Sequence, residues 1–310
     1  MPEAIQEGYR IRRKKNRDLV CKELPRCKVY SRRGYEDMIE SMDIFMVGSD
    51  QMWNPSPNLF NVHNLLDFVP DHKRKISYGT SIGWKRIPEE KEEFYRKYIP
   101  RFYRIGVRER NAENELTRIA GKLSIQTVLD PSFLMTRKDF DEITSEVCIP
   151  ALEGKRYIFC YVLGTKNTTW MHDVEVFSGK ENMPAFCALT DAVNESYVPP
   201  SCCVPLPDIG LPEFIKCIMN AEYIVTDSFH ATALSINLNK KFAVYRRFDD
   251  DTRLTDLLNT FNLESRFEFN HGDNHELEFI REEIDYASVN EIKNNLRNES
   301  IKFLLDSIEM

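Results

Sequence analysis

The sequence predicts an α/β protein built on parallel β-sheets. Short apolar runs rich in β-branched residues alternate along the chain with segments whose apolar residues recur at helical spacing. Small and polar residues follow several of these runs, at the carboxyl ends of the strands, where parallel sheets bind ligands. At 310 residues the chain exceeds the usual domain size of about 100–200 residues. Two domains are therefore expected.

The first half predicts four strands with two connecting helices. The strands are expected at residues 43–47, within 75–83, at 102–107 and at 125–129, and the helices at 88–99 and 112–120. From residue 140 to 155 the pattern gives way to charged and turn residues. We therefore place a domain boundary near residue 150.

The second half predicts further strands and helices of the same kind. Strands are expected at 157–163, 184–189, 221–226 and 241–245, and helices from residue 212, from 228, at 252–261 and at 288–308. A loop is predicted between the strand at 184–189 and the helix from residue 212, because this stretch contains Pro199, Pro200, Pro205 and Pro207. The expected organisation is a basic leader (1–40), an N-terminal domain (41–150), a C-terminal domain (151–270) and C-terminal helices (271–310).

Composition indicates a globular protein that remains in the cytoplasm. The apolar fraction is 42% and the charged fraction is 29%, and no run approaches the ~20 apolar residues that span a bilayer. The polar first residues lack the apolar core of a secretory signal. The eight cysteines include no C-x-x-C pair. Cys160 and Cys217 lie in apolar runs, which favours reduced packing residues over metal ligands, and no metal site is expected.

Charge is distributed unevenly. The net charge of −7 argues against a nucleic-acid partner. Residues 1–35 hold eleven basic and four acidic residues, or +7, so the remainder carries −14. A solvated, partly disordered leader is the common meaning of such a run, and peripheral contact with an anionic membrane or a lipid diphosphate is the alternative.

The junction around His230 has the composition of a strand, a turn and a helix. Ile224, Val225 and Thr226 suit a buried strand, and Asp227 or Ser228 can cap the helix that follows. His230 would then lie in the first helical turn, where the helix dipole favours a phosphate or carboxylate. A histidine at such a junction is otherwise a structural residue.

Other predicted strand ends carry further candidates. Gly48 to Pro55 forms a polar loop in which Trp53 either offers a stacking face or is buried in a tight turn. Arg108 follows the third strand, in Arg108-Glu109-Arg110, and suits either an anionic ligand or an ordinary Arg–Glu ion pair. Arg246 and Arg247 follow the last strand, where ligands bind.

Four stretches together resemble the polysaccharide pyruvyl transferase family. They are Gly48-Ser49-Asp50-Gln51-x-Trp53-Asn54, Ser77-Tyr78-x-x-Ser81-x-Gly83, Val107-Arg108-Glu109 with Asp130-Pro131-x-Phe133, and Thr226-Asp227-Ser228-Phe229-His230. Their order and spacing match over roughly residues 40–250. The resemblance implies two Rossmann-like domains that face a cleft, as in GT-B glycosyltransferases. It also implies phosphoenolpyruvate as donor and a sugar of a cell-surface glycan as acceptor. Together with the basic leader, this makes a lipid-linked glycan at the inner face of the membrane an expected form of the acceptor.

The resemblance assigns roles to the candidates. His230 would be the general acid and base, because an imidazole gives and takes protons near neutrality. Ser228 would hold the phosphate or carboxylate of the donor, and Arg108 would supply cationic stabilisation across the cleft. Asp227 is expected among the substrate-binding residues, and Ser49, Asp50 and Ser81 would line the site. No cofactor besides the donor substrate is implied.

The sequence departs from the family pattern in two places. Ala231 stands where the family has glycine, which a helical turn accommodates. The usual opening strand and Asn-Tyr-Gly-type loop are not found ahead of Gly48, so the first domain is expected to be shortened. This leaves two alternatives: a binding or partner protein of the same fold that has lost turnover, or a GT-B-type glycosyltransferase that uses a sugar nucleotide.

Overall fold

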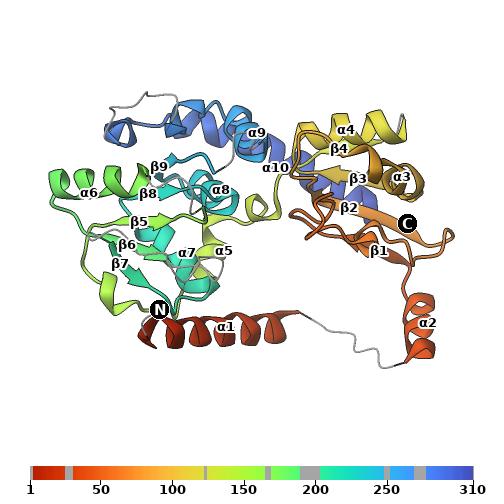
Figure 1. The fold of residues 1–310 in the computed structure, drawn as a ribbon, viewed down its shortest axis with the longest axis horizontal. Coiled ribbons are helices and arrows are strands. Elements are labelled where there is room, and N and C mark those ends of the chain that lie inside the picture. The colour runs from red at the N-terminus through yellow and green to blue at the C-terminus, as the bar shows by residue number, and fades with distance from the viewer. Residues whose placement is uncertain are drawn as a thin grey trace. The chain divides into compact units, whose positions relative to one another are not determined.

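The computed structural model describes residues 3–24, 31–121, 124–164, 169–188, 203–247, 252–268 and 277–309. The chain forms two compact units, each assembled from three stretches (Figure 1). Unit 1 comprises Met1–Arg26, Met135–Asp249 and Asn262–Val289, and unit 2 comprises Cys27–Leu134, Asp250–Phe261 and Asn290–Met310. The chain passes from unit 2 to unit 1 between Leu134 and Met135. The sequence predicts a domain boundary near residue 150.

Unit 2 is built on a four-stranded parallel sheet in the order β1-β2-β3-β4. Helices α3 and α4 pack on one face of this sheet, where Tyr95 and Leu116 join Ile105 in the core. Helix α10 lies on the other face, where Phe303 packs against Tyr78. The strands are β1 (Ile44–Val47), β2 (Arg74–Thr80), β3 (Arg104–Val107) and β4 (Ile125–Thr127). The helices are α2 (Arg32–Ser41), α3 (Glu89–Tyr98), α4 (Arg110–Ala120), α9 (Thr252–Thr260) and α10 (Tyr286–Ile308, which begins in unit 1), with short 3-10 turns at Val62–Leu65, Ile99–Arg101 and Pro131–Phe133.

Unit 1 is built on a five-stranded parallel sheet in the order β7-β6-β5-β8-β9. Helix α6 covers one face, where Trp170 packs with Cys160, and α7 covers the other, where Phe214 meets Phe159 at 5.7 Å between ring centroids. The strands are β5 (Ile158–Tyr161), β6 (Ala185–Ala188), β7 (Cys203–Leu206), β8 (Tyr223–Thr226) and β9 (Lys241–Val244). The helices are α1 (Glu3–Glu23), α5 (Arg137–Ile143), α6 (Thr169–Glu181), α7 (Leu211–Asn220) and α8 (Phe229–Asn237), with 3-10 turns at Pro150–Leu152, Glu264–Arg266 and Glu278–Arg281.

The α/β class and the parallel sheets are confirmed in both units. Helices lie on both faces of each sheet because strands of a parallel sheet are joined by crossovers that cover them. Cys160 and Cys217 are fully buried in the core, as predicted. Among the described residues, no helix is long and apolar enough to cross a membrane.

Two segments differ from the prediction. Residues 203–206 of the expected proline-rich loop form strand β7, and Pro205 is accommodated because β7 is the edge strand of its sheet. Pro207 follows β7 directly, and Pro199 and Pro200 of the expected loop lie outside the described residues. The expected partly disordered leader contains helix α1, which docks on unit 1 through Gly8 and Tyr9, and helix α2.

Candidate functional site

The loops that follow β1 and β2 in unit 2 are tied together at the carboxyl edge of the sheet. The Ser81 amide donates to the carbonyl oxygen of Asp50 at 2.8 Å, and Asp50 pairs with Thr80 in an isolated parallel bridge. Asp50 adopts a left-handed backbone conformation with φ of +71°. Such a conformation in a residue other than glycine stores strain, which proteins tolerate mostly at functional sites.

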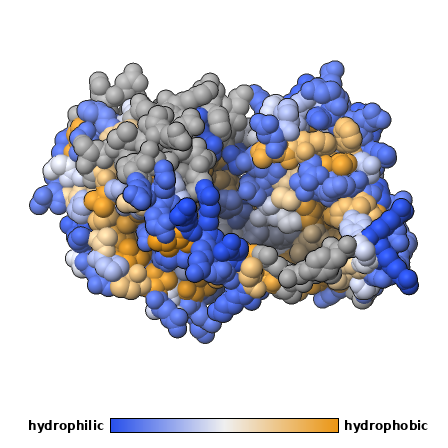
Figure 2. Space-filling view, turned by 60° about the horizontal axis from the view of Figure 1, so that its bottom comes forward, coloured by the Kyte–Doolittle hydropathy of each residue, from blue (hydrophilic) through white to orange (hydrophobic). Residues whose placement is uncertain are grey.

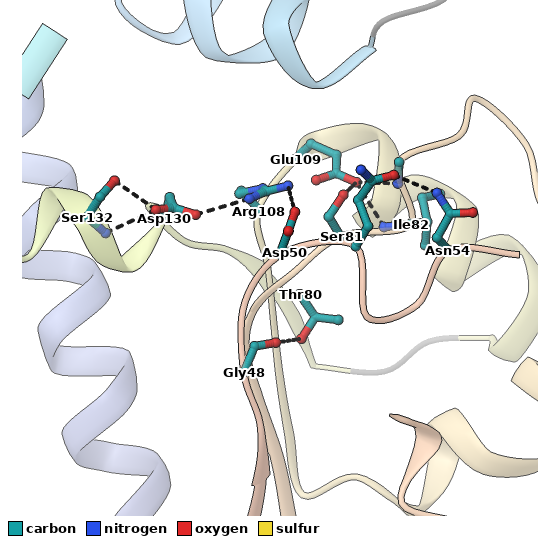
Figure 3. Close-up of polar contacts among 12 residues, drawn as sticks. Gly48, Asp50, Asn54, Thr80, Ser81, Ile82, Arg108, Glu109, Asp130 and Ser132 are labelled. Atoms are coloured by element: carbon teal, nitrogen blue, oxygen red, sulfur yellow. Dashed lines mark hydrogen bonds and ion pairs between the residues drawn. The ribbon is translucent and has the colours of Figure 1, made fainter. Parts of the chain in front are cut away.

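Arg108 forms the centre of a charged network in unit 2 (Figure 3). Its guanidinium donates to Asp50 Oδ1 at 3.2 Å and to Asp130 Oδ2 at 3.1 Å. Ser132 donates to the other oxygen of Asp130 through its amide at 3.0 Å and its hydroxyl at 2.7 Å. We call Asp50, Arg108, Asp130 and Ser132 the Arg108 network. Within this network the guanidinium of Arg108 pairs with two aspartates.

Exposure in the Arg108 network decreases from Asp50 inward. The Asp50 side chain is 53% exposed, while those of Arg108 and Asp130 are 2% and 3% exposed. Asp50 is therefore the charged residue of the network that a ligand can reach directly. An anion that binds Arg108 would have to compete with the Asp50 carboxylate.

Glu109 is a site residue that the sequence did not identify. Its Oε1 accepts hydrogen bonds from the Ser81 hydroxyl at 2.8 Å and from the amides of Ile82 and Gly83 at 3.0 and 3.3 Å (Figure 3). The side chain is buried, and Oε2 has no hydrogen-bond partner among the described residues. Burial raises the pKa of the Glu109 carboxyl, against the opposing effects of Arg108 and these donors. Its place directly after Arg108, at the cap of the next helix, is the signal that could have found it.

The remaining unit 2 candidates are mostly structural. Ser81 is fully buried, with its hydroxyl on Glu109. Ser49 is half-buried and packs near Gly79: a Cβ added to Gly79 would lie 3.3 Å from the existing Cβ of Ser49. Trp53 is 1% exposed and donates from Nε1 to the carbonyl oxygen of Asn64 at 2.8 Å, which makes it a buried packing residue.

In unit 1, the predicted junction of strand, turn and helix is present at the end of β8. Ser228 is the N-cap of α8 and accepts from the Ala231 amide at 3.5 Å. Thr226 fixes the turn, because its hydroxyl donates to the carbonyl oxygen of Tyr161 at 2.5 Å and accepts from the Ser228 amide at 3.0 Å. His230 follows on the first turn of α8 and is exposed, while Asp227 and Ser228 are buried. The junction therefore presents an imidazole at the positive end of a helix.

Asp227 joins the ends of three strands in unit 1. Its two carboxylate oxygens accept from the amides of Leu163 at 2.6 Å and Gly164 at 2.7 Å, which follow β5. A Cβ placed on Gly164 would lie 3.2 Å from Cγ of Arg247, so Arg247 at the end of β9 borders the same loop. Burial raises the pKa of Asp227, while the two amides and the charge of Arg247 act in the opposite direction. We call Gly164, Asp227, Ser228, His230 and Arg247 the His230 site.

The structure thus groups the predicted residues by unit. Asp50, Ser81 and Arg108 come together in unit 2, and Asp227, Ser228, His230 and Arg247 come together in unit 1. Arg246 is half-buried beside Arg247 at the end of β9. Within the described ranges, no cluster of three histidine, cysteine, aspartate or glutamate residues is arranged to hold a metal.

These features define a class of protein. Parallel α/β units with polar residues at their carboxyl edges are Rossmann-like, and proteins of this class bind ligands at that edge. The chain belongs to the polysaccharide pyruvyl transferase family, whose sequence model matches residues 4–249. The match begins within α1, ahead of the region from residue 40 onward in which the family motifs lie.

Solved structures with a similar fold support the class. A complex of S. aureus MnaA with UDP is 12% identical, with 88% of this chain and 77% of that chain covered and a TM-score of 0.52. A UDP-N-acetylglucosamine 2-epimerase is also 12% identical, with 89% and 76% covered and a TM-score of 0.52. The UDP-GlcNAc 2-epimerase of Methanocaldococcus jannaschii is 12% identical, with 96% and 90% covered and a TM-score of 0.50. At these identities the likeness concerns the fold alone. No curated protein matches the sequence of the chain.

Proposed function

We propose that this protein transfers the pyruvyl group of phosphoenolpyruvate to a sugar of a cell-surface polysaccharide. The product is a pyruvate ketal, and inorganic phosphate is released. The observation that carries the proposal is the exposed imidazole of His230 on the first turn of α8, in a chain that belongs to the pyruvyl transferase family.

The proposed reaction requires proton transfer to a carbon atom of the donor and from hydroxyl oxygens of the acceptor. A proton is added to the methylene carbon of phosphoenolpyruvate, which leaves a cationic C2. One sugar hydroxyl attacks C2 and loses its proton, phosphate leaves C2, and a second hydroxyl attacks C2 and loses its proton to close the ketal ring. The two hydroxyl protons balance the one added to carbon and the one that departs with phosphate.

His230 suits the role of the proton carrier in this scheme. An imidazole can donate the proton that goes to carbon and accept one from a hydroxyl near neutral pH. The N-terminus of α8, capped by Ser228, and the guanidinium of Arg247 favour an anionic group beside it. We assign them to the carboxylate or the phosphate of the donor.

Asp50 is the unit 2 residue that we assign to the acceptor. Its carboxylate is half exposed and held by a buried arginine, so its orientation is fixed before a ligand arrives. A fixed carboxylate can accept a hydrogen bond from a sugar hydroxyl. Arg108 would act through Asp50.

The test compares His230→Gln with His172→Gln. His172 is exposed on α6 of the same unit and serves as the matched control. Phosphate release from phosphoenolpyruvate is followed with a panel of monosaccharide glycosides as acceptors. Loss of a general acid–base residue typically slows a reaction by about 100- to 10,000-fold. We expect such a loss in His230→Gln only, and equal rates in both variants would exclude the assigned role.

Donor binding is tested separately by thermal unfolding. A ligand at about 100 times its dissociation constant stabilises a protein by about 2.7 kcal/mol. We expect stabilisation by phosphoenolpyruvate. If a nucleotide sugar stabilises the protein and phosphoenolpyruvate does not, the glycosyltransferase alternative replaces the proposal. Stabilisation by phosphoenolpyruvate without turnover on any acceptor of the panel would favour a binding protein.

A further inference from the structure

Helix α1 docks on unit 1 through one of its sides. The residues on that side are buried or half-buried and recur at helical spacing: Ile5, Gly8, Tyr9, Arg12, Lys15 and Leu19. The opposite side is exposed and includes Arg10, Arg13 and Arg17. Figure 2 brings the lower side of Figure 1, where α1 lies, toward the viewer, and hydrophilic and apolar side chains lie next to one another on that face.

Three docking contacts of α1 lie at the carboxyl edge of the unit 1 sheet. Gly8 lies against Pro207, the first residue after β7. Asn16 Oδ1 accepts from the amide of Leu211, the first residue of α7, at 2.9 Å, and Lys15 pairs with Glu213 at 2.6 Å. The carboxyl edge is where a sheet of this kind binds its ligand. Helix α1 therefore lies at the ligand-binding edge of unit 1.

Arg12 brings a positive charge from α1 to this edge. Its guanidinium stacks over the ring of Tyr9 at 4.8 Å from the ring centroid, and its side chain is half-buried. Tyr161 ends β5 and packs edge-to-face on Phe214 of α7, with ring centroids 4.7 Å apart. Helix α1 is thus linked to Tyr161 through the first turn of α7, because Lys15 pairs with Glu213 and the adjacent Phe214 contacts the Tyr161 ring. Burial raises the pKa of the Tyr161 hydroxyl; the charges of Arg12 and Arg247 act to lower it, and the charge of Asp227 acts to raise it.

We propose that α1 forms one wall of the His230 site and that Arg12, together with Arg247, binds a phosphate or carboxylate group of the ligand. This inference rests on the site of the proposed function and adds a binding residue from the basic leader. Two guanidinium groups near one tyrosine provide the planar donors that phosphate and carboxylate groups favour.

The test measures anion binding by titration calorimetry at low ionic strength, with phosphoenolpyruvate and inorganic phosphate as separate probes. The variants are Arg12→Gln, Arg12→Lys and the matched control Arg10→Gln, which removes an 80% exposed arginine from the same helix. We expect about a tenfold loss of affinity in Arg12→Gln, the equivalent of one modest charge-assisted hydrogen bond. Arg12→Lys should retain part of the affinity, and Arg10→Gln should bind as the unaltered protein does.

The outcomes separate this inference from the proposed function. Phosphate binding that depends on Arg12, without any binding of phosphoenolpyruvate, would support the wall of the site and contradict pyruvyl transfer. Phosphoenolpyruvate binding with equal affinity in Arg12→Gln and Arg10→Gln would overturn the role of Arg12 and leave the proposed function standing. Failure of both probes to bind the unaltered protein would overturn both. Circular dichroism of each variant establishes that α1 remains helical.

Discussion

The guanidinium of Arg108 and the carboxylate of Asp50 are paired at 3.2 Å, although one is 2% exposed and the other is 53% exposed. The pair therefore connects the interior of unit 2 to its surface. On the inner side the same guanidinium pairs with Asp130, which is also buried. The two aspartates share one partner but differ in their access to water.

This difference predicts unequal costs for removing each aspartate. Asp130→Asn leaves Arg108 without its buried partner, and breaking a buried pair costs about 3–5 kcal/mol. Asp50→Asn removes a half-exposed partner while Asp130 remains, and we expect a loss of about 1 kcal/mol or less. Urea unfolding of both variants measures the two free energies. Equal destabilisation would contradict the assignment of Asp130 as the inner anchor.

Glu109 predicts a pH dependence of stability. Its folded pKa is raised above the unfolded value, so the folded state holds a proton that the unfolded state has already lost. The contribution of Glu109 to stability is therefore fully present below the unfolded pKa, which is about 4.3 for glutamate. It is lost as the pH rises through the folded pKa.

The variant Glu109→Gln should lack this pH dependence. Relative to the unaltered protein, its free energy of unfolding should improve as the pH rises from 4 toward 8, because a neutral amide can keep the acceptor oxygen for Ser81. Urea unfolding across this range measures the trend, and Glu93→Gln on the exposed side of α3 is the control. A difference between variant and unaltered protein that does not change with pH would show that Glu109 titrates normally.

The sequence predicted most of the fold but not the partners of its charged residues. The strand before Asp227 and the helix after Ser228 were predictable, because local composition determines where such elements begin and end. The partners of Arg108 were not, because Asp50 and Asp130 are distant along the chain. Asp50 meets Arg108 only when β1 and β3 pair with β2, and Asp130 meets it only when β4 pairs with β3. Local sequence offered only the neighbour Glu109.

Strand β7 and helix α1 show a second limit of sequence reasoning. Pro205 argues against a strand in general, but not against an edge strand, and the position of a strand within its sheet depends on distant segments. The charges of residues 10–17 indicated a solvated segment, whereas the docked side of α1 is defined by Gly8 and Tyr9 against unit 1. A glycine in a charged run gave no signal of close packing by itself.

The loop after β2 depends on the glycine at position 83. Gly83 has φ of +63°, and a Cβ there would lie 2.4 Å from Gln51 Oε1 and 3.0 Å from Asn54 Nδ2. We expect Gly83→Ala to destabilise by about 2–3 kcal/mol, from backbone strain and the forced movement of both side chains. Gly121→Ala is the control, because Gly121 also has positive φ but no atom within 4 Å of the added Cβ. If the two variants lose equal stability in urea unfolding, the contact with Gln51 has no energetic weight.

The docking of α1 depends on the absence of a side chain at position 8. A Cβ on Gly8 would lie 2.6 Å from Cβ and Cγ of Pro207, a separation that real side chains do not reach. We expect Gly8→Ala to shift α1 away from Pro207, although alanine favours a helix over glycine by about 1 kcal/mol. Limited proteolysis should then cut α1 faster than in the unaltered protein, since an undocked helix of this length frays in water. Gly179→Ala in α6 is the matched control, because a Cβ there meets no atom within 4 Å and should only strengthen the helix. Slower cleavage of α1 in Gly8→Ala would mean that helix propensity outweighs the contact with Pro207, and that α1 does not depend on this contact to stay at the edge of the sheet.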